Sequence, residues 1–256
     1  MKLHFLGTCS GSEPMPGRHH TSTALEISGR LYFLDAGESC SYTAHLSGLD
    51  LLATRAVIIS HPHMDHIGGL CNLLWTVRKL VRVQKRPAIA DVLPVYLPVA
   101  AVGQAIESLL NNAEDYLLEL CPIEMKTYGA GAVMDDGYLR VTSFPNTHVQ
   151  PVNGVPYSYS FLLECEGRRI VLSGDIRSYS ELDDAIGEGC DALIVETGHH
   201  KIADIHAYVQ GKHVGKVFFI HHGREILNDP ETALERIAEL FGDRAVLCND
   251  GMEVPL

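Results

Sequence analysis

A histidine-rich segment at the end of a short apolar run is the feature that most constrains this chain. The sequence SHPHMDH occupies residues 60–66 and directly follows a run typical of a buried strand. Imidazole and carboxylate groups are preferred ligands of Zn²⁺ and similar divalent cations. His61 and His63 can project together past the end of the strand, while Asp65 and His66 lie on the following turn and can face a second ion. The segment therefore predicts a metal site with room for two ions.

The alternative interpretation is a polar loop that contains these histidines by chance. The chain has 14 histidines among 256 residues, so a pattern of this density arises by chance only rarely. A single motif remains a hypothesis until its context supports it.

The pattern at residues 61–66 resembles the signature of the metallo-β-lactamase superfamily. In that superfamily an isolated histidine, an aspartate after a strand and a last histidine after another strand follow in this order. His148, Asp175 and His221 have these residue types, follow strand-like runs and come in the same order. The resemblance therefore covers essentially the whole chain.

The resemblance implies a dinuclear site with a metal-bound hydroxide as the nucleophile. It implies two divalent ions, Zn²⁺ first and Mn²⁺ or Fe as alternatives, since histidine and carboxylate ligands suit all three. The implied ligands are His61, His63 and His148 for one ion, Asp65, His66 and His221 for the other, and Asp175 as the bridge. Asp65 is also expected to orient or deprotonate the attacking water.

Two of these ligand assignments have alternatives, and one further aspartate is expected to support a ligand. His222 directly follows His221, and the alternation of side chains along the preceding strand favours His221 as the ligand. His148 has the alternative interpretation of a loop histidine. Asp35, within the sequence LDAG, matches the first motif of the superfamily, and we expect it to hydrogen-bond a ligand imidazole rather than to act in catalysis.

Within the superfamily the chain most resembles the ribonuclease Z-like phosphodiesterases. The sequences FLGTCSG (residues 5–11) and GRHHTS (residues 17–22) are similar to the N-terminal loop of that group. Other branches differ at single positions: flavodiiron enzymes carry Glu where His63 stands, and secreted zinc β-lactamases usually carry Cys where Asp175 stands. Glyoxalase II-like thioesterases usually place the third histidine in Gly-His-Thr-Pro-Gly, which the surroundings of His148 do not match.

Two features depart from the tRNA-processing members of that group. The chain has no long Gly/Pro-rich insertion of the kind that grips tRNA, and the His-Ser/Thr motif before the last ligand is matched only by His199-His200-Lys201. A histidine in that place could protonate a leaving group or hold a phosphate oxygen, so His199 and His200 are catalytic candidates and His206 is a weaker one. The alternative is an exposed polar loop after a strand.

Apolar runs and turn signals alternate along the chain, without repeats or long linkers, which predicts a single domain over residues 1–256. The resemblance implies an α/β (α+β) fold, the four-layer αβ/βα sandwich of two mixed β-sheets flanked by helices. Strands are predicted at Lys2–Leu6, Thr23–Ile27, Leu31–Leu34, Ala56–Ile59, Leu93–Leu97, Leu139–Phe144, Tyr159–Cys165, Arg169–Leu172, Ala192–Val195, Val217–Ile220 and Ala245–Leu247. Helices are predicted at Ser39–Ser47, Gly69–Val81, Ala100–Leu120, Ser180–Ile186 and Glu231–Leu240.

The last helix has the clearest local signals. Asp229 can cap it, Pro230 occupies the first helical position and Gly242 ends it. Its apolar face is predicted to comprise Leu234, Ile237, Ala238 and Phe241. Near the N-terminus, the Ser28-Gly29 turn between two apolar runs predicts an antiparallel meander.

Charge limits the substrate classes. The chain has 20 Lys+Arg and 32 Asp+Glu, a net charge of −12, which disfavours a general nucleic-acid binder. A basic run over residues 78–86 could contact phosphates, although such a run is more often the solvated face of a helix. The expected substrate is a small anionic ester, or a nucleotide or RNA 3′ end.

Cysteine usage and hydropathy bear on location. Seven dispersed cysteines without a Cys-x-x-Cys pair predict reduced core thiols. No apolar run approaches the ~18 residues of a membrane span, and the first residues are too polar for a secretory signal. We therefore expect a cytoplasmic protein without a membrane partner. The apolar segment at 100–120 is compatible with a homodimer face or with ordinary packing.

Together these features predict a metal-dependent hydrolase that cleaves a phosphodiester at a dinuclear site. One alternative keeps the site but cleaves a thioester, lactone or other carboxylic ester. Another is a non-catalytic sensor that keeps the metals for stability. The complete ligand set argues against the sensor, because a chain that had lost catalysis would tolerate the loss of ligands.

Overall fold

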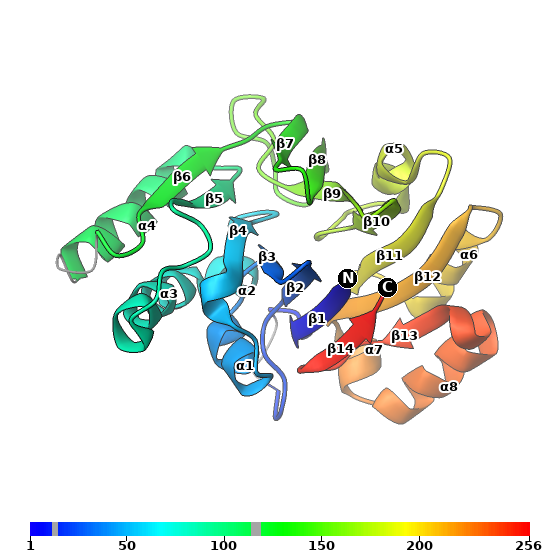
Figure 1. The fold of residues 1–256 in the computed structure, drawn as a ribbon. Coiled ribbons are helices and arrows are strands. Elements are labelled where there is room, and N and C mark those ends of the chain that lie inside the picture. The colour runs from blue at the N-terminus through cyan, green and yellow to red at the C-terminus, as the bar shows by residue number, and fades with distance from the viewer. Residues whose placement is uncertain (12–14, 114–118) are drawn as a thin grey trace. The chain divides into compact units, whose positions relative to one another are not determined.

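The computed structural model describes residues 1–11, 15–113 and 119–256. They form two compact units, each built on a seven-stranded sheet (Figure 1). Unit 1 comprises Met1–Gly7, His19–Tyr128 and Asp250–Leu256, and unit 2 comprises Thr8–Arg18 and Gly129–Asn249. The single domain over residues 1–256 stays a prediction. Within the described ranges, no helix has the length and apolar character needed to cross a bilayer.

The sheet of unit 1 has the strand order β14-β1-β2-β3-β4-β5-β6. Its strands are β1 (Lys2–Gly7), β2 (Ser22–Ile27), β3 (Arg30–Leu34), β4 (Thr54–Ile58), β5 (Leu93–Leu97), β6 (Ile123–Thr127) and β14 (Met252–Pro255). Pairing is antiparallel from β14 to β3 and parallel from β3 to β6, so the sheet is mixed. Ser28 and Gly29 join β2 to β3 with positive φ angles of 48° and 73°, as a tight hairpin turn requires, which confirms the predicted meander.

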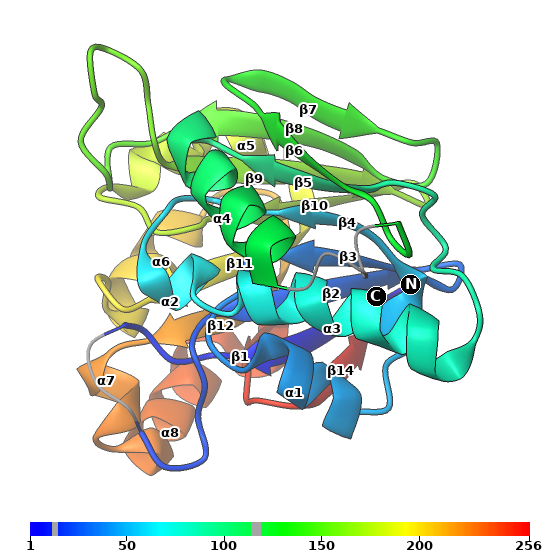
Figure 2. The same cartoon turned by 90° about the vertical axis from the view of Figure 1, so that its left-hand side faces the viewer.

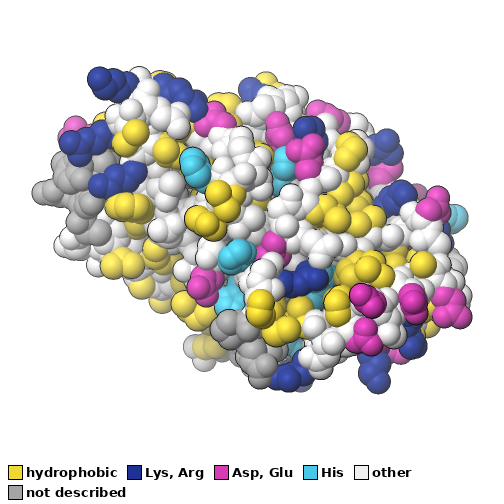
Figure 3. All heavy atoms as spheres, turned by 90° about the horizontal axis from the view of Figure 1, so that it is seen from below, with side chains coloured by type: hydrophobic (Ala, Val, Ile, Leu, Met, Phe, Trp, Pro, Cys, Tyr) yellow, Lys and Arg dark blue, Asp and Glu magenta, His cyan; other side chains and the backbone are white. Residues whose placement is uncertain are grey.

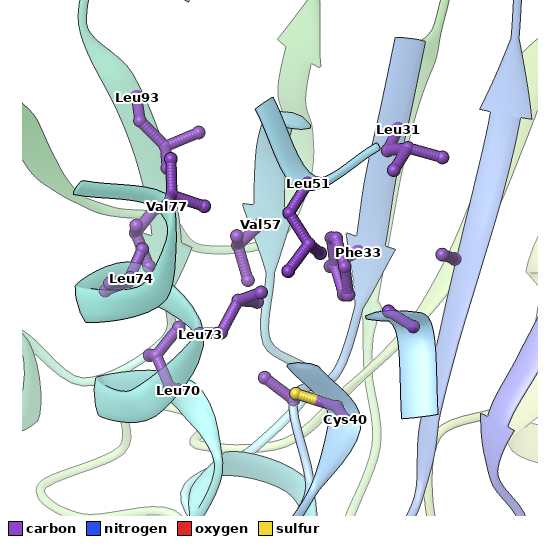
Figure 4. Close-up of a cluster of buried hydrophobic side chains, with 14 of the residues drawn as sticks. Leu31, Phe33, Cys40, Leu51, Val57, Leu70, Leu73, Leu74, Val77 and Leu93 are labelled. Carbon is purple, nitrogen blue, oxygen red and sulfur yellow. The ribbon is translucent and has the colours of Figure 1, made fainter. Parts of the chain in front are cut away.

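Helices pack on one face of this sheet (Figure 2). They are α1 (Cys40–Leu46), α2 (Met64–Ile67), α3 (Leu70–Gln84) and α4 (Ala100–Ala113), with the short 3₁₀ helix η1 (Leu51–Ala53). Phe33 of β3 and Val57 of β4 belong to one buried cluster with Leu70 and Leu73 of α3 (Figure 4). Each fully buried side chain of this kind contributes about 1.5–3 kcal/mol. The cluster holds β4 in place, and β4 leads directly into the histidine-rich segment.

The sheet of unit 2 has the strand order β13-β12-β11-β10-β9-β8-β7. Its strands are β7 (Gly131–Asp135), β8 (Arg140–Pro145), β9 (Tyr159–Cys165), β10 (Arg168–Leu172), β11 (Cys190–Thr197), β12 (Val214–His222) and β13 (Ala245–Leu247). The four strands from β10 to β13 are parallel, and β7 to β10 pair antiparallel. The carboxyl ends of β10, β11 and β12 therefore lie at one edge of the sheet.

Helices cover this sheet as well, and α6 and α8 lie beside β12 (Figure 1). The helices of unit 2 are η3 (Tyr179–Leu182), α5 (Asp183–Ile186), α6 (Ile202–Val209), α7 (Arg224–Leu227), α8 (Pro230–Phe241) and η4 (Gly242–Arg244). Asp229 accepts a hydrogen bond of 3.1 Å from the Thr232 amide, Pro230 begins α8, and Gly242 follows it with a φ of 60°. The predicted caps of α8 are confirmed.

The set of residues predicted to form the apolar face of α8 is wrong in part. Ala233, Ile237 and Phe241 are buried, whereas Leu234 is 51% exposed and Ala238 is also exposed. The three buried residues are spaced by four, which places them on one stripe that faces the core of unit 2. The sequence contains apolar residues on both sides of this stripe, so periodicity alone does not choose between them.

Every predicted strand is present, with ends within three residues of the expected ones. The three unpredicted strands, β6, β7 and β14, all lie at sheet edges, where half-exposed side chains weaken the apolar pattern. The helix predicted at Ala100–Leu120 ends at Ala113 in α4, and residues 114–118 lie outside the described ones. The unpredicted α2 and α7 are single turns, and α6 is also unpredicted.

The prediction for the cysteines is confirmed, whereas the prediction for the basic run at residues 78–86 is wrong in part. All seven cysteines are free thiols and six are buried, as predicted. The interpretation of residues 78–86 as a solvated face is wrong for Arg78, which is 4% exposed and donates from Nε to the Cys121 carbonyl at 3.2 Å. Burial lowers the pKa of Arg78.

Candidate metal centre

The carboxyl end of β4 positions the candidate ligands of unit 1. His61 is fully buried, and its Nε2 lies 3.1 Å from Nδ1 of His63. Two nitrogens bound to one tetrahedral Zn²⁺ at 2.0–2.1 Å are about 3.3 Å apart, so this spacing suits a shared ion. Asp65, on α2, has its Oδ2 3.5 Å from Nε2 of His66. The four candidate residues of unit 1 therefore form two pairs of potential metal ligands, His61 with His63 and Asp65 with His66.

Asp35 anchors these pairs and has a positive φ of 58°. It is 2% exposed, and its Oδ1 accepts from the Ser60 amide at 2.7 Å. Its Oδ2 lies 2.8 Å from the Ser60 hydroxyl and 2.7 Å from Nδ1 of His66. A carboxylate only accepts, so Nδ1 of His66 carries the proton and Nε2 is the nitrogen presented to a metal. The expectation that Asp35 hydrogen-bonds a ligand imidazole agrees with this geometry.

The Ser60 hydroxyl extends this control to the first histidine. It has one hydrogen, which it donates to Asp35, and its oxygen lies 3.0 Å from Nδ1 of His61. Nδ1 of His61 is then the donor to Ser60, and Nε2 is left to face a metal. One buried carboxylate thereby selects the tautomer of two candidate ligands, His61 and His66.

The candidate residues of unit 2 lie at the carboxyl ends of its parallel strands. Asp175 follows β10 and is 2% exposed. Its Oδ2 lies 3.3 Å from Nε2 of His221, at the end of β12, and 3.6 Å from Nε2 of His148, which follows β8. Asp175 is thus the common neighbour of both predicted histidines within this unit.

A bulge aims the side chain of His221. Glu196 pairs with Ile220 and Thr197 pairs with His222, so His221 is the extra residue between two ladder partners. It has a φ of 49°, which is uncommon for a residue with a side chain and re-aims it relative to the strand. Gly198 makes room for the ring, because a Cβ there would lie 2.7 Å from Cε1 of His221. The bulge, rather than regular alternation, therefore separates His221 from His222.

His222 is occupied within the core. Its Nε2 donates to the Cys248 carbonyl at 2.8 Å, and its Nδ1 lies 3.1 Å from the Thr197 hydroxyl. Burial lowers the pKa of His222 to about 3, so the ring is neutral at neutral pH. With both nitrogens engaged by the protein, His222 is placed as a structural residue, and the geometry favours His221 as the candidate ligand.

Glu196 is a residue whose role the sequence did not reveal. It is the penultimate residue of β11 and is 1% exposed. Its carboxylate accepts from the amides of Ile176 (3.3 Å) and His199 (2.8 Å) and lies 3.0 Å from Nδ1 of His199. A buried carboxylate requires such donors, so the Glu that ends the apolar run 192–195 was the available signal. Glu196 holds the loop after β11 in place.

The two catalytic candidates on that loop differ in their surroundings. The side chain of His199 is 45% exposed, and its ring centroid lies 4.9 Å from that of His148 and 5.7 Å from that of His221. His200 donates from Nε2 to the Ile176 carbonyl at 2.9 Å and packs against Tyr179 at 4.4 Å between ring centroids. His199 therefore lies among the candidate ligands, while His200 supports the loop beside them.

The weaker candidate, His206, is elsewhere on unit 2. It belongs to α6, and its ring packs edge-on against Phe241 of α8, with 5.0 Å between ring centroids. This contact is part of the packing between the two helices.

Glu181 connects the two loops that carry His148 and Asp175. Its Oε1 accepts from the amide (2.8 Å) and hydroxyl (2.6 Å) of Thr147, which precedes His148. Its Oε2 accepts from the amides of Arg177 (2.9 Å) and Ser178 (3.2 Å), which follow Asp175. Burial alone would raise the pKa of Glu181, but these hydrogen bonds outweigh it and the pKa is lowered.

The donor chemistry of unit 2 fits a divalent cation. His148, Asp175 and His199 offer ligand atoms within 4.8 Å of one another, and so do Glu196, His199 and His221. Neutral imidazoles and carboxylates are the donors that Zn²⁺ accepts. The residues present in each unit are therefore suited to metal binding.

Comparison with known proteins places the chain in a family. The model of the family described as anti-Pycsar protein Apyc1 matches residues 1–212. The chain belongs to this family.

This Apyc1-family chain is also similar to curated ribonucleases. It is 28% identical over 202 residues to ribonuclease Z of Mycobacterium bovis, covering 76% of the chain and 69% of the relative. It is 31% identical over 173 residues to ribonuclease BN of Erwinia tasmaniensis, covering 66% of the chain and 49% of the relative. A match to ribonuclease Z of Methanothermobacter thermautotrophicus, 29% identical, covers 58% of the chain and 45% of the relative. The chain thus spans about half the length of two of these relatives.

Solved structures share the fold of the Apyc1-family chain. The short form of human tRNase Z has a TM-score of 0.72 at 20% identity and covers 100% of this chain and 99% of its own. The metallo-β-lactamase fold protein YhfI from Bacillus subtilis has a TM-score of 0.75 at 15% identity, covering 99% of each chain. Zn²⁺-bound PqqB from Methylobacterium extorquens has a TM-score of 0.69 at 15% identity, covering 100% of each.

These comparisons confirm the resemblance to ribonuclease Z-like members of the metallo-β-lactamase superfamily. The two mixed sheets flanked by helices are the fold of that superfamily, as predicted. The curated relatives named above are described as ribonucleases. One structural neighbour contains zinc, and the histidine and aspartate groups of this chain are candidates for metal binding.

Proposed function

We propose that the chain is a metal-dependent phosphodiesterase that acts on a small anionic ester or a nucleotide. The observation that carries this proposal is the buried Asp35–Ser60 pair, which orients His61 and His66 for metal binding before any substrate is present. Preset ligand tautomers serve a metal rather than packing alone. The names of the ribonuclease relatives, and of a structural neighbour described as a diphosphatase from the PhnP family, support phosphoester chemistry.

The proposed cofactor is a pair of divalent ions, with Zn²⁺ first and Mn²⁺ or Fe as alternatives. The proposed ligands are those implied by the order of the superfamily motifs: His61, His63 and His148, then Asp65, His66 and His221, with Asp175 shared. When bound, such ions activate water and neutralise the charge that develops on a phosphoryl group. That the two units supply one site between them is part of this proposal.

The side chains of the chain have separate roles in the proposed reaction. Asp65 orients the attacking water and accepts its proton as the new P–O bond forms. His199 donates a proton from Nε2 to the departing alkoxide as the old P–O bond breaks. The Glu196 carboxylate, 3.0 Å from Nδ1 of His199, stabilises the protonated ring before transfer. We assign the proton donor to His199 rather than His200, since Nε2 of His200 already donates to a carbonyl.

Charge favours a small substrate over a long nucleic acid. The net charge is −12, and basic and acidic side chains are interspersed on the face drawn in Figure 3. A long polyanion would meet carboxylates along such a surface. An RNA 3′ end remains the larger alternative within the same reaction class. The predicted homodimer and the cytoplasmic location stay predictions.

The test is hydrolysis of bis(p-nitrophenyl) phosphate by purified protein of known metal content. We expect Asp175→Asn to lower turnover at least ~100-fold and to reduce bound metal, because it removes the carboxylate shared by the histidines. Asp183→Asn is the matched control, since Asp183 pairs with Lys212 at the surface. If protein with two bound metals hydrolyses a carboxylic thioester but no diester, the proposed reaction is wrong and the ester alternative replaces it.

A further inference from the structure

The amino-terminal ends of the parallel strands in unit 2 form a second hollow. The residues that line it lie at or beside the starts of β10, β11 and β12 and just before β13. They are Arg168, Arg169, Gly189, Cys190, Asp191, His213, Gly215, Lys216, Asp243 and Arg244. The hollow has a volume of 560 Å³. Because these strands are parallel, it lies at the sheet edge opposite to Asp175 and His221. Lys216 and His221 are five residues apart on β12, which corresponds to about 17 Å.

Two of its cations are compensated and two are not. Arg168 pairs with Asp191 at 2.9 Å, and the guanidinium of Arg169 pairs with Glu164 at 3.5 Å. Lys216, by contrast, donates to the main-chain carbonyl of Asp243 at 2.7 Å, and Arg244 donates to that of Val214 at 2.8 Å. Among the described residues, neither of these two cations has a carboxylate oxygen within 4.0 Å.

This arrangement is unusual in a chain with an excess of acidic residues. Carbonyl oxygens hold the Lys216 and Arg244 side chains in place but leave their positive charges uncompensated. An ammonium has three donors and a guanidinium has five, so both retain donors for a ligand. A phosphate group matches such a pair, because it offers several acceptor oxygens and at least one negative charge.

We propose that this hollow binds a small phosphate-bearing molecule, whose phosphate is held by Lys216 and Arg244. The site is separate from the candidate metal centre and does not depend on the proposed function. Its volume lies within the range of small-molecule pockets. The Asp191 and Asp243 side chains in its wall would accept hydrogen bonds from hydroxyl groups of the ligand.

The surroundings favour a small ligand over a nucleic-acid strand. The two neighbouring hollows share Arg169 with this one, but their linings bring in Glu164, Glu166 and Glu188. A strand that extended beyond Lys216 and Arg244 in this direction would carry its phosphates past these carboxylates. The uncompensated positive charge is thus confined to an area that suits one phosphate group.

The experiment is a calorimetric titration of the full chain with inorganic phosphate, at an ionic strength held constant with chloride. We expect Lys216→Met and Arg244→Met each to weaken binding about tenfold or more, since each removes a charge-assisted hydrogen bond. Lys212→Met is the matched control, because this lysine lies just before β12 but pairs with Asp183 at 2.8 Å. Lys216 and Arg244 are exposed, so these changes leave the core intact.

A second variant distinguishes phosphate binding in this hollow from phosphate binding at the candidate metal centre. In Asp175→Asn, the binding that depends on Lys216 and Arg244 should persist unchanged. The proposal is overturned if phosphate binding is absent, if it is equal in the Lys216, Arg244 and Lys212 variants, or if Asp175→Asn alone removes it. None of these outcomes depends on whether the chain hydrolyses a phosphodiester.

Discussion

A Cβ atom on Gly198 would lie 2.7 Å from Cε1 of His221, closer than side-chain atoms approach a ring without displacing it. Gly198 has no positive φ, so its backbone is open to any residue and the absence of a side chain is the only requirement. This glycine therefore sets the position of the candidate ligand next to it in space.

Gly198→Ala should displace the ring of His221 and lower both metal content and diester turnover, with turnover falling about 10–100-fold. Metal analysis and bis(p-nitrophenyl) phosphate hydrolysis measure the two effects. Gly129→Ala is the control, because no atom lies within 4 Å of a Cβ at that position. Equal turnover in both variants would show that the position of His221 does not matter.

The neighbouring histidines should respond in opposite ways to the same substitution. His221→Ala should remove turnover and metal. His222→Ala should retain metal and turnover per folded molecule but lower the free energy of unfolding by about 2–4 kcal/mol, because it empties a buried site and removes the shorter of the two hydrogen bonds to the Cys248 carbonyl. Urea unfolding and metal analysis together separate the two outcomes. The reverse pattern would assign the ligand to His222.

The proton-donor role of His199 predicts a dependence on the leaving group. His199→Gln should lower turnover of a dinucleoside phosphate, which releases a basic alkoxide, by about 10²-fold. Turnover of bis(p-nitrophenyl) phosphate should change far less, since p-nitrophenolate leaves without a proton. His200→Gln serves as the control for the neighbouring ring. A loss of equal size on both substrates would indicate a structural or ligand role for His199.

The lowered pKa of Glu181 predicts that the stability of the fold depends on pH. Its pKa in the folded chain lies below the ordinary 4.5, so its ionised form stabilises the fold above pH 4.5. This contribution is lost as the pH falls through the lowered pKa of the folded state. Glu181→Gln should therefore reduce the free energy of unfolding by about 0.5–1.5 kcal/mol at pH 7 and by less at pH 3.

Urea unfolding of Glu181→Gln and wild type at the two pH values measures this difference. The effect is modest because the side chain is only partly buried and solvent screens its charge. Glu188→Gln is the control, because Glu188 is exposed. A difference between Glu181→Gln and wild type that is the same at pH 7 and pH 3 would contradict the prediction.

Local patterns in the sequence were sufficient to predict the candidate ligands and much of the order of strands and helices along the chain. The four donors of residues 61–66 lie within six residues of one another, so their spacing is a local property of the sequence. Buried strands appear as short apolar runs, and the caps of α8 are set by Asp229, Pro230 and Gly242 within one segment. Each of these features depends on residues close together in the chain.

The geometry of each donor depends on residues that are distant in the chain, and local patterns do not contain this information. The position of His221 depends on a bulge between β11 and β12 and on the space at Gly198. The buried face of α8 and the burial of Arg78 depend on what packs against them. Glu196 acquired its role from the amides that surround it. Periodicity and spacing describe one segment at a time, whereas burial and hydrogen-bond partners come from segments that meet only when the chain has folded.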